Sequence, residues 1–468
     1  MNQVNDLRIE SLVLKGVGVF DDTRIDFSSK PDGSGKAEVH LFTGPNGCGK
    51  STLLYALAGI FDGMNGAGLV RRRYLSTAST VSYKSSRSYG QYGAQRPNAG
   101  DKADEQNTFS SEFGPVSLWY NDVSQGVYGA IDRADFPTNN EITNIPSYKQ
   151  LHAGYNHATG LSATTFPFAA FAYSGQRTLT QVSIGAIADV SVAPLENALS
   201  FDFTARPQIM VQWIANNRAM AAMAKADGED AAAAAYDLSL TRITDAVRDI
   251  CDLDVRFKVT RSPLAVAVVV GGVQTPFDAL PDGLKSVVSW IADLTIRLEA
   301  IPWEDRSIDI FSQRIFLFLD EVDVHLHPRW QRRILPAVQR LLPNAQIFVS
   351  THSPFVVGSV DEAWIYRLPE RGKQRERVIK PLPSGAGKSY RLILDEIFGI
   401  EQEFDVETER MFDEFYAERD QFLRQRASSD QLLGAATRLA ERSEEARTIV
   451  ETELRQISRR SGVEVRLA

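Results

Sequence analysis

The most informative segment of the chain reads Gly44-Pro45-Asn46-Gly47-Cys48-Gly49-Lys50-Ser51, and Thr52 follows it. This spacing matches the phosphate-binding P-loop in full, with an apolar strand expected before it at Glu38–Phe42 and an amphipathic helix after it. Glycines let backbone N–H groups converge on phosphate oxygens, and a helix N-terminus favours negative charge. We therefore expect residues 44–52 to bind a nucleoside triphosphate, with Lys50 on its terminal phosphates and Ser51 on magnesium.

A second apolar strand, Ile315–Leu319, ends in the acid pair Asp320 and Glu321. In sheets of this kind, an acid at the carboxyl end of a buried parallel strand lies beside the P-loop. We expect Asp320 to hold magnesium and Glu321 to polarise the attacking water, because phosphoryl transfer needs mainly positioning and charge neutralisation. His352 follows the next apolar strand, Gln346–Ser350, where it can hydrogen-bond the terminal phosphate.

The rest of the chain shows how the elements are divided. Its 468 residues, 43% of them apolar, are enough for one large domain with insertions or for two domains. Alternating apolar residues at Leu7–Leu14 and Val19–Phe27 predict a hairpin, and three short runs between Val255 and Pro276 predict an antiparallel set. These patterns predict an α/β fold.

Three segments lie outside this pattern. Residues 62–113 are rich in Ser, Gly, Tyr and Arg, and we interpret them as a surface insertion. Residues 208–253 predict a helical insert that breaks at Gly228. Residues 401–468 predict a helical tail with an apolar stripe, which either binds a partner or packs on its own domain. The nucleotide-binding domain would then occupy residues 1–400.

Composition limits the classes of function. The net charge of −8 argues against a strongly basic nucleic-acid binder. The two cysteines, Cys48 and Cys251, suggest neither a metal site nor a disulfide framework, so a reducing cytoplasm fits. The start of the chain lacks the pattern of a signal peptide, and the longest apolar run, Pro263–Val270, is too short to cross a bilayer as a helix.

A family resemblance rests on the residues around the acid pair. Asp320-Glu321-Val322-Asp323-Val324-His325-Leu326-His327-Pro328 and Thr351-His352-Ser353-Pro354 resemble the ABC-type ATPases of the SMC/RecF/OLD branch, which are AAA-family ATP-binding proteins. Leu280–Ser286 resembles their signature motif, in which Asp282, Gly283 and Lys285 would bind ATP held by an opposing subunit. Pro281 stands where that motif usually has serine. Gln176 resembles the Q-loop glutamine that helps to hold magnesium. The resemblance covers residues 7–400.

The resemblance implies a P-loop NTPase with an ABC-type nucleotide-binding core and an antiparallel β subdomain. It also implies that ATP and Mg²⁺ are the ligands, that ATP is hydrolysed, and that the chain forms a homodimer or higher oligomer. The chain is similar to ATPase subunits of bacterial anti-phage systems such as Septu and PARIS, which act with a separate effector, often a nuclease. Since no acid cluster is evident on strands in the tail, we expect no nuclease domain in this chain.

Two other functions remain open. A DNA-repair or chromosome-maintenance ATPase of the RecF/SMC type would bind DNA, and Arg71–Arg73 with nearby tyrosines could contact phosphates and bases. The acidic net charge favours a solvated loop there instead. The ATPase subunit of a membrane transporter is disfavoured by the run Asp320–Pro328 and the altered signature.

Overall fold

A computed structural model describes most of the chain, and it divides the chain into two compact units, Met1–Ile393 and Leu394–Ala468. The described residues are 7–30, 35–61, 69–70, 72–76, 79–86, 89–93, 109–111, 114–116, 155–156, 161–162, 165–175, 184, 186–188, 190, 193–262, 264–370, 378–424 and 428–467.

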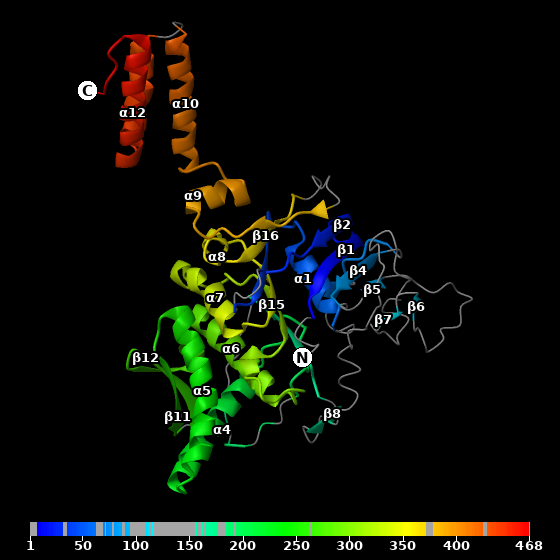
Figure 1. The fold of residues 1–468 in the computed structure, drawn as a ribbon. Helices are drawn as coiled ribbons and strands as arrows, with labels where there is room; N and C mark the ends of the chain where they lie inside the picture. Colours follow the sequence, from blue (N-terminus) through cyan, green and yellow to red (C-terminus); the bar gives the residue numbers. More distant parts are fainter. Residues whose placement is uncertain are drawn as a thin grey trace. The chain divides into compact units, whose positions relative to one another are not determined.

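The first unit is built on a six-stranded sheet (Figure 1). Its order is β10 (Ala169–Ser174), β14 (Ile315–Asp320), β15 (Gln346–Ser350), β3 (Glu38–Thr43), β16 (Ala363–Arg367) and β18 (Leu382–Pro383). Neighbouring strands from β10 to β16 pair in parallel, and β18 is antiparallel. Every residue of β3, β10, β14 and β15 is buried, as is usual for strands of a parallel sheet that is covered on both faces.

Helix α1 (Lys50–Gly59) follows β3 and packs against β10, β14 and β15. The sequence predicts an amphipathic helix here, but that prediction is wrong. Buried residues occur all around the helix, including Thr52, Leu53, Leu54 and Ala56 in succession. Because helical neighbours three and four residues apart share a face, such a run has no solvent-facing side.

A second sheet contains the predicted hairpin. It also contains a strand from the segment that the sequence predicts to be a surface insertion. Its order is β17 (Val378–Ile379), β2 (Phe20–Asp26), β1 (Ile9–Val17), β4 (Thr80–Ser85) and β5 (Tyr89–Gly93). The interpretation of residues 62–113 as a surface insertion is wrong for β4. This strand pairs along β1, and the Val81 and Tyr83 side chains are buried. Ser82, between these two residues, interrupts the apolar pattern, so the sequence did not indicate that this strand lies inside the sheet.

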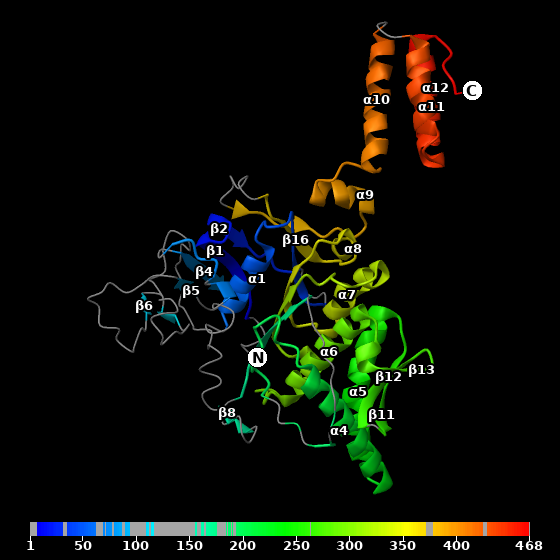
Figure 2. The same ribbon diagram turned by 180° about the vertical axis from the view of Figure 1, so that it is seen from behind.

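The helical part of the first unit contains α4 (Pro207–Ala226), α5 (Asp230–Cys251), α6 (Asp282–Ala300) and α7 (Pro328–Leu341). The predicted break between α4 and α5 occurs at Gly228, where φ is +79°. Figure 2 shows α4 and α5 beside the three-stranded antiparallel sheet of β11 (Val255–Arg261), β12 (Leu264–Val270) and β13 (Val273–Pro276). Helix α8 (Pro354–Val357) and 3₁₀-helices η3 (Phe277–Ala279) and η4 (Ile310–Ser312) complete this region.

Short elements account for several remaining segments. Strands β6 (Phe109–Ser111) and β7 (Gly114–Val116) pair with each other, as do β8 (Tyr155–Asn156) and β9 (Leu161–Ser162). The sequence also predicts strands at Val116–Tyr120 and Val127–Ile131; only Val116, at the end of β7, lies within the described residues. A second Gly-Lys-Ser sequence, at 387–389, lies in a loop that leads into α9 (Tyr390–Ile393).

A buried polar network joins the two large sheets. Glu38 Oε1 accepts hydrogen bonds from Arg8 and Gln346, each at 2.8 Å, and lies 2.8 Å from His40 Nε2. Gln346 also accepts a hydrogen bond from the Ile9 N–H and donates one to the Ile9 carbonyl. Burial opposes the charge on Glu38, but the His40 and Arg8 contacts outweigh it and lower the pKa of this carboxyl to about 2.

The second unit has its own apolar core. It comprises the π-helical turn η5 (Leu394–Phe398), α10 (Val406–Leu423), α11 (Ser429–Ala440) and α12 (Glu444–Ser461). The apolar stripe of the tail, including Leu432, Leu439, Val450 and Leu454, is buried in this core beside Phe415. The stripe therefore packs within its own unit. In the part of the chain that the structure describes, no helix is both long enough and apolar enough to cross a membrane.

Candidate nucleotide-binding site

The P-loop connects the carboxyl end of β3 to the first turn of α1. Gly44 and Gly49 have φ angles of +149° and +101°, which side chains rarely tolerate. A Cβ atom on Gly49 would lie 2.7 Å from the Phe20 ring, and one on Gly44 would lie 2.5 Å from the Leu368 carbonyl. Backbone conformation and close packing therefore both require glycine, and they shape the turn that the phosphate-binding sequence predicts.

The charged side chain of the loop is buried beside that turn. Lys50 is 6% exposed, and its Nζ donates to the carbonyl oxygens of Gly44 at 3.0 Å and Pro45 at 3.1 Å. Its ammonium group also lies 3.7 Å from Cys48 Sγ. Burial raises the pKa of the Cys48 thiol, although nearby Lys50 opposes this effect. The fold thus holds the Lys50 ammonium group over the loop, and Cys48 stays a neutral thiol.

Asp320 is the centre of a hydrogen-bonded group formed from three elements. Ser51 Oγ on α1 donates to Asp320 Oδ1 at 3.2 Å, and Ser350 Oγ at the end of β15 donates to the same oxygen. The Glu321 N–H donates to Ser350 Oγ at 2.7 Å. The parallel register of β14 and β15 brings these groups to one edge of the sheet. Ser350 was not assigned a role from the sequence, although its place at the end of the neighbouring strand could have indicated one.

These residues fit a magnesium–nucleotide ligand. Burial raises the pKa of Asp320, while the Ser350 and Ser51 hydrogen bonds and the Lys50 charge oppose that rise. A divalent cation would offset the burial of this carboxylate, and hydroxyl and carboxylate oxygens are the donors that Mg²⁺ prefers. Within the described ranges, no cluster of three or more His, Cys, Asp or Glu side chains forms a separate metal site. Ser51 and Asp320 would therefore share the ion with phosphate oxygens.

The loop after the acid pair is shaped by unusual backbone conformations. Glu321 and His325 have φ angles of +50° and +63°, which non-glycine residues adopt uncommonly. A Cβ atom on Gly175 would collide with the Glu321 carbonyl, and the Gly175 N–H donates to the Asp320 carbonyl at 2.7 Å. The residue after β10 thus packs directly against the backbone of the acid pair. Gln176, the predicted Q-loop residue, lies just outside the described residues and stays a prediction.

His352 lies at the end of β15, as the sequence predicts, and its side chain is exposed. Asp323 supports this turn by accepting from Thr351 Oγ1 at 2.6 Å and from the His352 N–H at 3.4 Å. Partial desolvation and then the Lys50 charge lower the pKa of the His352 imidazole, although Asp323 opposes them. A neutral imidazole can donate one hydrogen bond at neutral pH.

The three signature residues lie at the start of α6. Asp282 is exposed, and Lys285 Nζ lies 3.3 Å from its carboxylate. Gly283 is buried, and a Cβ atom there would lie 2.5 Å from the His325 carbonyl. Gly283 therefore allows α6 to approach the loop after the acid pair in the same chain. Contact of these residues with ATP on a second chain stays a prediction.

Sequence reasoning missed Arg73 as a neighbour of this site. Its guanidinium lies over the Tyr55 ring at 4.6 Å and donates to the Leu69 carbonyl at 2.8 Å. Burial, followed by the Asp320 charge, raises the pKa of Tyr55 to about 12. Arg73 therefore belongs to the surroundings of the acid pair, which the DNA-binding interpretation of Arg71–Arg73 did not anticipate. Because this contact depends on tertiary packing, no local sequence signal could have shown it.

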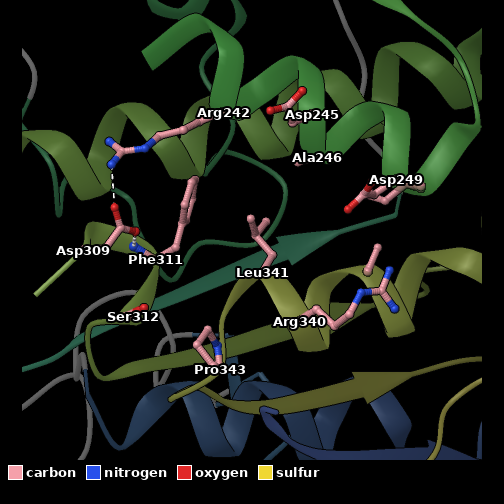
Figure 3. A pocket seen from close by; sticks show the side chains of 12 residues that line it. Arg242, Asp245, Ala246, Asp249, Asp309, Phe311, Ser312, Arg340, Leu341 and Pro343 are labelled. Carbon is pink, nitrogen blue, oxygen red and sulfur yellow. Dashed lines mark hydrogen bonds and ion pairs between the residues drawn. The ribbon is translucent and has the colours of Figure 1, made fainter. Parts of the chain in front are cut away.

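A separate pocket lies between α5, η4 and α7. It has a volume of about 420 Å³, and Arg242 pairs with Asp309 along one side of it (Figure 3). Phe311 and Leu341 form part of its apolar lining, with Arg340 nearby. None of the P-loop or acid-pair residues lines this pocket.

Two family descriptions match segments that carry the site. Residues 11–108, which include the P-loop, match "AAA domain". Residues 270–358, which include the acid pair and His352, match "AAA domain, putative AbiEii toxin, Type IV TA system".

Several curated proteins are similar to the chain. The "Retron Ec83 probable ATPase" of Escherichia coli is 23% identical over 401 residues, which cover 77% of this chain and 71% of that protein. The "Retron Vc95 probable ATPase" of Vibrio cholerae serotype O1 biovar El Tor is 29% identical over 30% of this chain and 27% of its own length. The "Septu protein PtuA" of Bacillus thuringiensis is 27% identical over 33% of this chain and 40% of its own length. The matches to the latter two therefore span less than half of each relative.

Among solved structures, the SMC head domain from Thermotoga maritima aligns with 80% of this chain and 98% of its own, at 13% identity and a TM-score of 0.36. That likeness is too weak to add to the strand order described above. The parallel order β10-β14-β15-β3-β16, the P-loop, the acid pair and the family matches agree with one another. The chain therefore has a P-loop NTPase fold, and it carries two segments that match AAA domains, one with the P-loop and one with the acid pair.

Proposed function

We propose that this chain is an ATP-hydrolysing regulatory subunit that associates with itself around ATP and controls a separate effector in anti-phage defence. The observation that supports hydrolysis best is the convergence of Ser51 and Ser350 on Asp320, with Glu321 next to it. The similarity to retron and Septu proteins supports the defence role.

The proposed chemistry follows from the positions of the side chains. Lys50 and the P-loop N–H groups bind the phosphates of ATP. Magnesium, when held by Ser51 and Asp320, supplies positive charge that neutralises the phosphate oxygens. Glu321 accepts a proton from the water that attacks the terminal phosphorus, ADP leaves, and neutral His352 donates a hydrogen bond to the transferred group.

Self-association would complete this site. Asp282, Gly283 and Lys285 of a second chain would face the nucleotide, and Gln176 would contact the magnesium. ATP would then favour the associated state because it contacts both chains, and hydrolysis would remove that preference. The protein would act in the cytoplasm, and its effector would be a separate protein such as a nuclease.

Turnover of ATP by the purified chain tests the enzymatic part. We expect Mg²⁺-dependent release of phosphate, and we expect Glu321→Gln to lower it by roughly a hundredfold or more while ATP still binds. Normal turnover by this variant would remove Glu321 from the role of base.

Capture from the native host tests the regulatory part. The Glu321→Gln protein, held with ATP, is expected to retain a second protein in stoichiometric amount. Capture of DNA in a salt-dependent manner, without a second protein, would contradict the proposed control of an effector and would favour a DNA-repair ATPase instead.

A further inference from the structure

A buried polar cluster in the first unit has no part in the chemistry described above. Its centre is Asp293 on α6, whose side chain is 3% exposed. The Tyr173 hydroxyl donates to Asp293 Oδ2 at 3.0 Å, and Arg297 Nε donates to the same oxygen at 2.6 Å. Arg206 Nε lies 3.5 Å from the other oxygen. One carboxylate therefore holds a phenol and two guanidinium groups in the interior.

The phenol connects this cluster to the acid pair. Tyr173 belongs to β10, and the next residue, Ser174, lies opposite Asp320 in the parallel register. Gly175 then donates to the Asp320 carbonyl and packs against the Glu321 carbonyl. The two residues that follow Tyr173 therefore contact the acid pair, so a displacement of Tyr173 would also displace the acid pair.

The carboxylate connects the cluster to the signature residues. Asp293 and Arg297 lie on α6, about three and about four turns after Gly283. Gly283 packs against the carbonyl of His325, in the loop that follows the acid pair. Helix α6 is thus held at two points, at its first turn by that loop and farther along by β10.

Arg297 extends the cluster to a third element. Its side chain is fully buried, and its terminal nitrogens donate to three backbone carbonyls at 2.6–2.9 Å: those of Pro194, Glu196 and Thr204. Phe201, in the same segment, packs its ring against Tyr55 of α1 at 4.4 Å. The cluster therefore joins α6, β10 and a segment that contacts the helix of the P-loop.

The chemistry of the cluster is better suited to fixing the orientation of α6 than to stabilising the fold. Buried ion pairs are often replaceable by apolar side chains without loss of stability, whereas they require one particular arrangement of partners. Here the donors of Arg297 fit three fixed carbonyls, and Asp293 accepts from the Tyr173 phenol. Aromatic contact between Tyr173 and Trp290, at 6.0 Å, fixes the ring itself.

We propose that Tyr173, Asp293 and Arg297 are positioning residues that fix the signature-bearing helix α6 relative to the acid pair, so that two chains can close on ATP. This role rests on the proposed ATP-dependent self-association. It predicts that loosening the cluster weakens association more than it weakens the binding of ATP to one chain.

The test compares Tyr173→Phe with Tyr366→Phe, each introduced into Glu321→Gln. Both changes keep the ring and remove one buried phenolic hydroxyl from the central sheet. Tyr366 lies on β16, at the other end of the parallel strands, where its hydroxyl contacts His40 and the Asp26 carbonyl. It is therefore a matched control for the general loss of a buried hydrogen bond.

Three quantities are measured for the parent and both variants: melting temperature, affinity for a fluorescent ATP analogue at low protein concentration, and the ATP-dependent association constant from light scattering. We expect Tyr173→Phe to lower the association constant by about tenfold, with a melting temperature and nucleotide affinity like those of Tyr366→Phe.

Equal association by the two variants would overturn the positioning role. So would a loss of association in Tyr173→Phe that is matched by a comparable loss of melting temperature and ATP affinity, since that pattern describes a structural residue. If the Glu321→Gln parent itself failed to associate with ATP, the proposed function would be overturned, and this role with it.

Discussion

The site depends on a small number of residues whose backbone positions are fixed by packing. Gly44 and Gly49 adopt backbone conformations that favour glycine, and neighbouring atoms leave no room for a side chain. The Lys50 ammonium lies over the same turn, where it donates to the Gly44 and Pro45 carbonyls.

Replacement of Lys50 by alanine is expected to weaken ATP binding by roughly a hundredfold, because charge-assisted hydrogen bonds to the phosphates are lost. Titration calorimetry measures the change. Lys388→Ala is the matched control, since Lys388 belongs to the other Gly-Lys-Ser sequence and lies in a loop before α9. Equal affinity in Lys50→Ala and the wild type would refute the P-loop assignment.

Ser350 supports the acid pair, and its removal should affect turnover. Ser350→Ala deletes the hydroxyl that accepts from the Glu321 N–H and donates to Asp320. We expect the rate of ATP hydrolysis to fall by about tenfold, because residues that orient metal ligands typically contribute this much. Steady-state phosphate release is the measurement. Ser359→Ala, which removes a hydroxyl that donates to the Val356 carbonyl, is the control. An unchanged rate would show that Ser350 only stabilises the strand end.

Residues in continuous motifs could be predicted, whereas those assembled from distant parts of the chain could not. The P-loop and the acid pair each follow a strand within a short segment, so local pattern and fold agree. The contact of Arg73 with Tyr55 and the cluster at Asp293 join residues far apart in sequence. Their partners depend on packing that no single segment encodes.

At the scale of elements, strand order explains both a success and a failure of sequence reasoning. Strands β3, β14 and β15 are buried on both faces, so their apolar runs could be recognised. Strand β4 lies between β1 and β5, but it places serines among its apolar residues. Its backbone partners, and not its composition, make it part of the sheet.

The junction between the two large sheets predicts a pH dependence. The pKa of Glu38 is about 2 in the folded chain and about 4.3 when unfolded. Its contribution to the free energy of unfolding is therefore fully present above about pH 4.3 and is lost as the pH falls toward 2. At neutral pH this contribution would be about 3 kcal/mol.

Chemical denaturation of the wild type and Glu38→Gln at several pH values checks this prediction. The wild type should be more stable near pH 7, and the difference should shrink as the pH falls from about 4.3 toward 2. Arg24→Gln, which breaks an exposed pair with Asp26, provides a control. A constant difference between wild type and Glu38→Gln across this range would contradict the ionisation of Glu38 in the fold.

At the scale of the whole molecule, the chain contains two units with separate cores. The second unit buries Phe415, Leu432, Val450 and Leu454 among its own helices. A segment that buries its apolar side chains in its own core can fold without the rest of the chain. The residues of the proposed nucleotide site all belong to the first unit.

Residues 394–468, produced alone, are therefore expected to be helical and to unfold cooperatively. Circular dichroism during thermal unfolding measures this, and Leu432→Ala should lower the stability by about 2–5 kcal/mol because it leaves a cavity in the core. Leu433→Ala, at a partly buried neighbouring position, should have a smaller effect. A disordered spectrum for the isolated segment would contradict its independence.

The molar mass of Glu321→Gln in solution, with and without MgATP, tests the account most directly. If ATP joins two chains across their nucleotide sites, light scattering should report at least twice the chain mass of 51.9 kDa with MgATP. The mass should be smaller without nucleotide, and Lys50→Ala in the same background should abolish the increase. A mass that does not respond to MgATP, despite confirmed binding, would contradict ATP-dependent association.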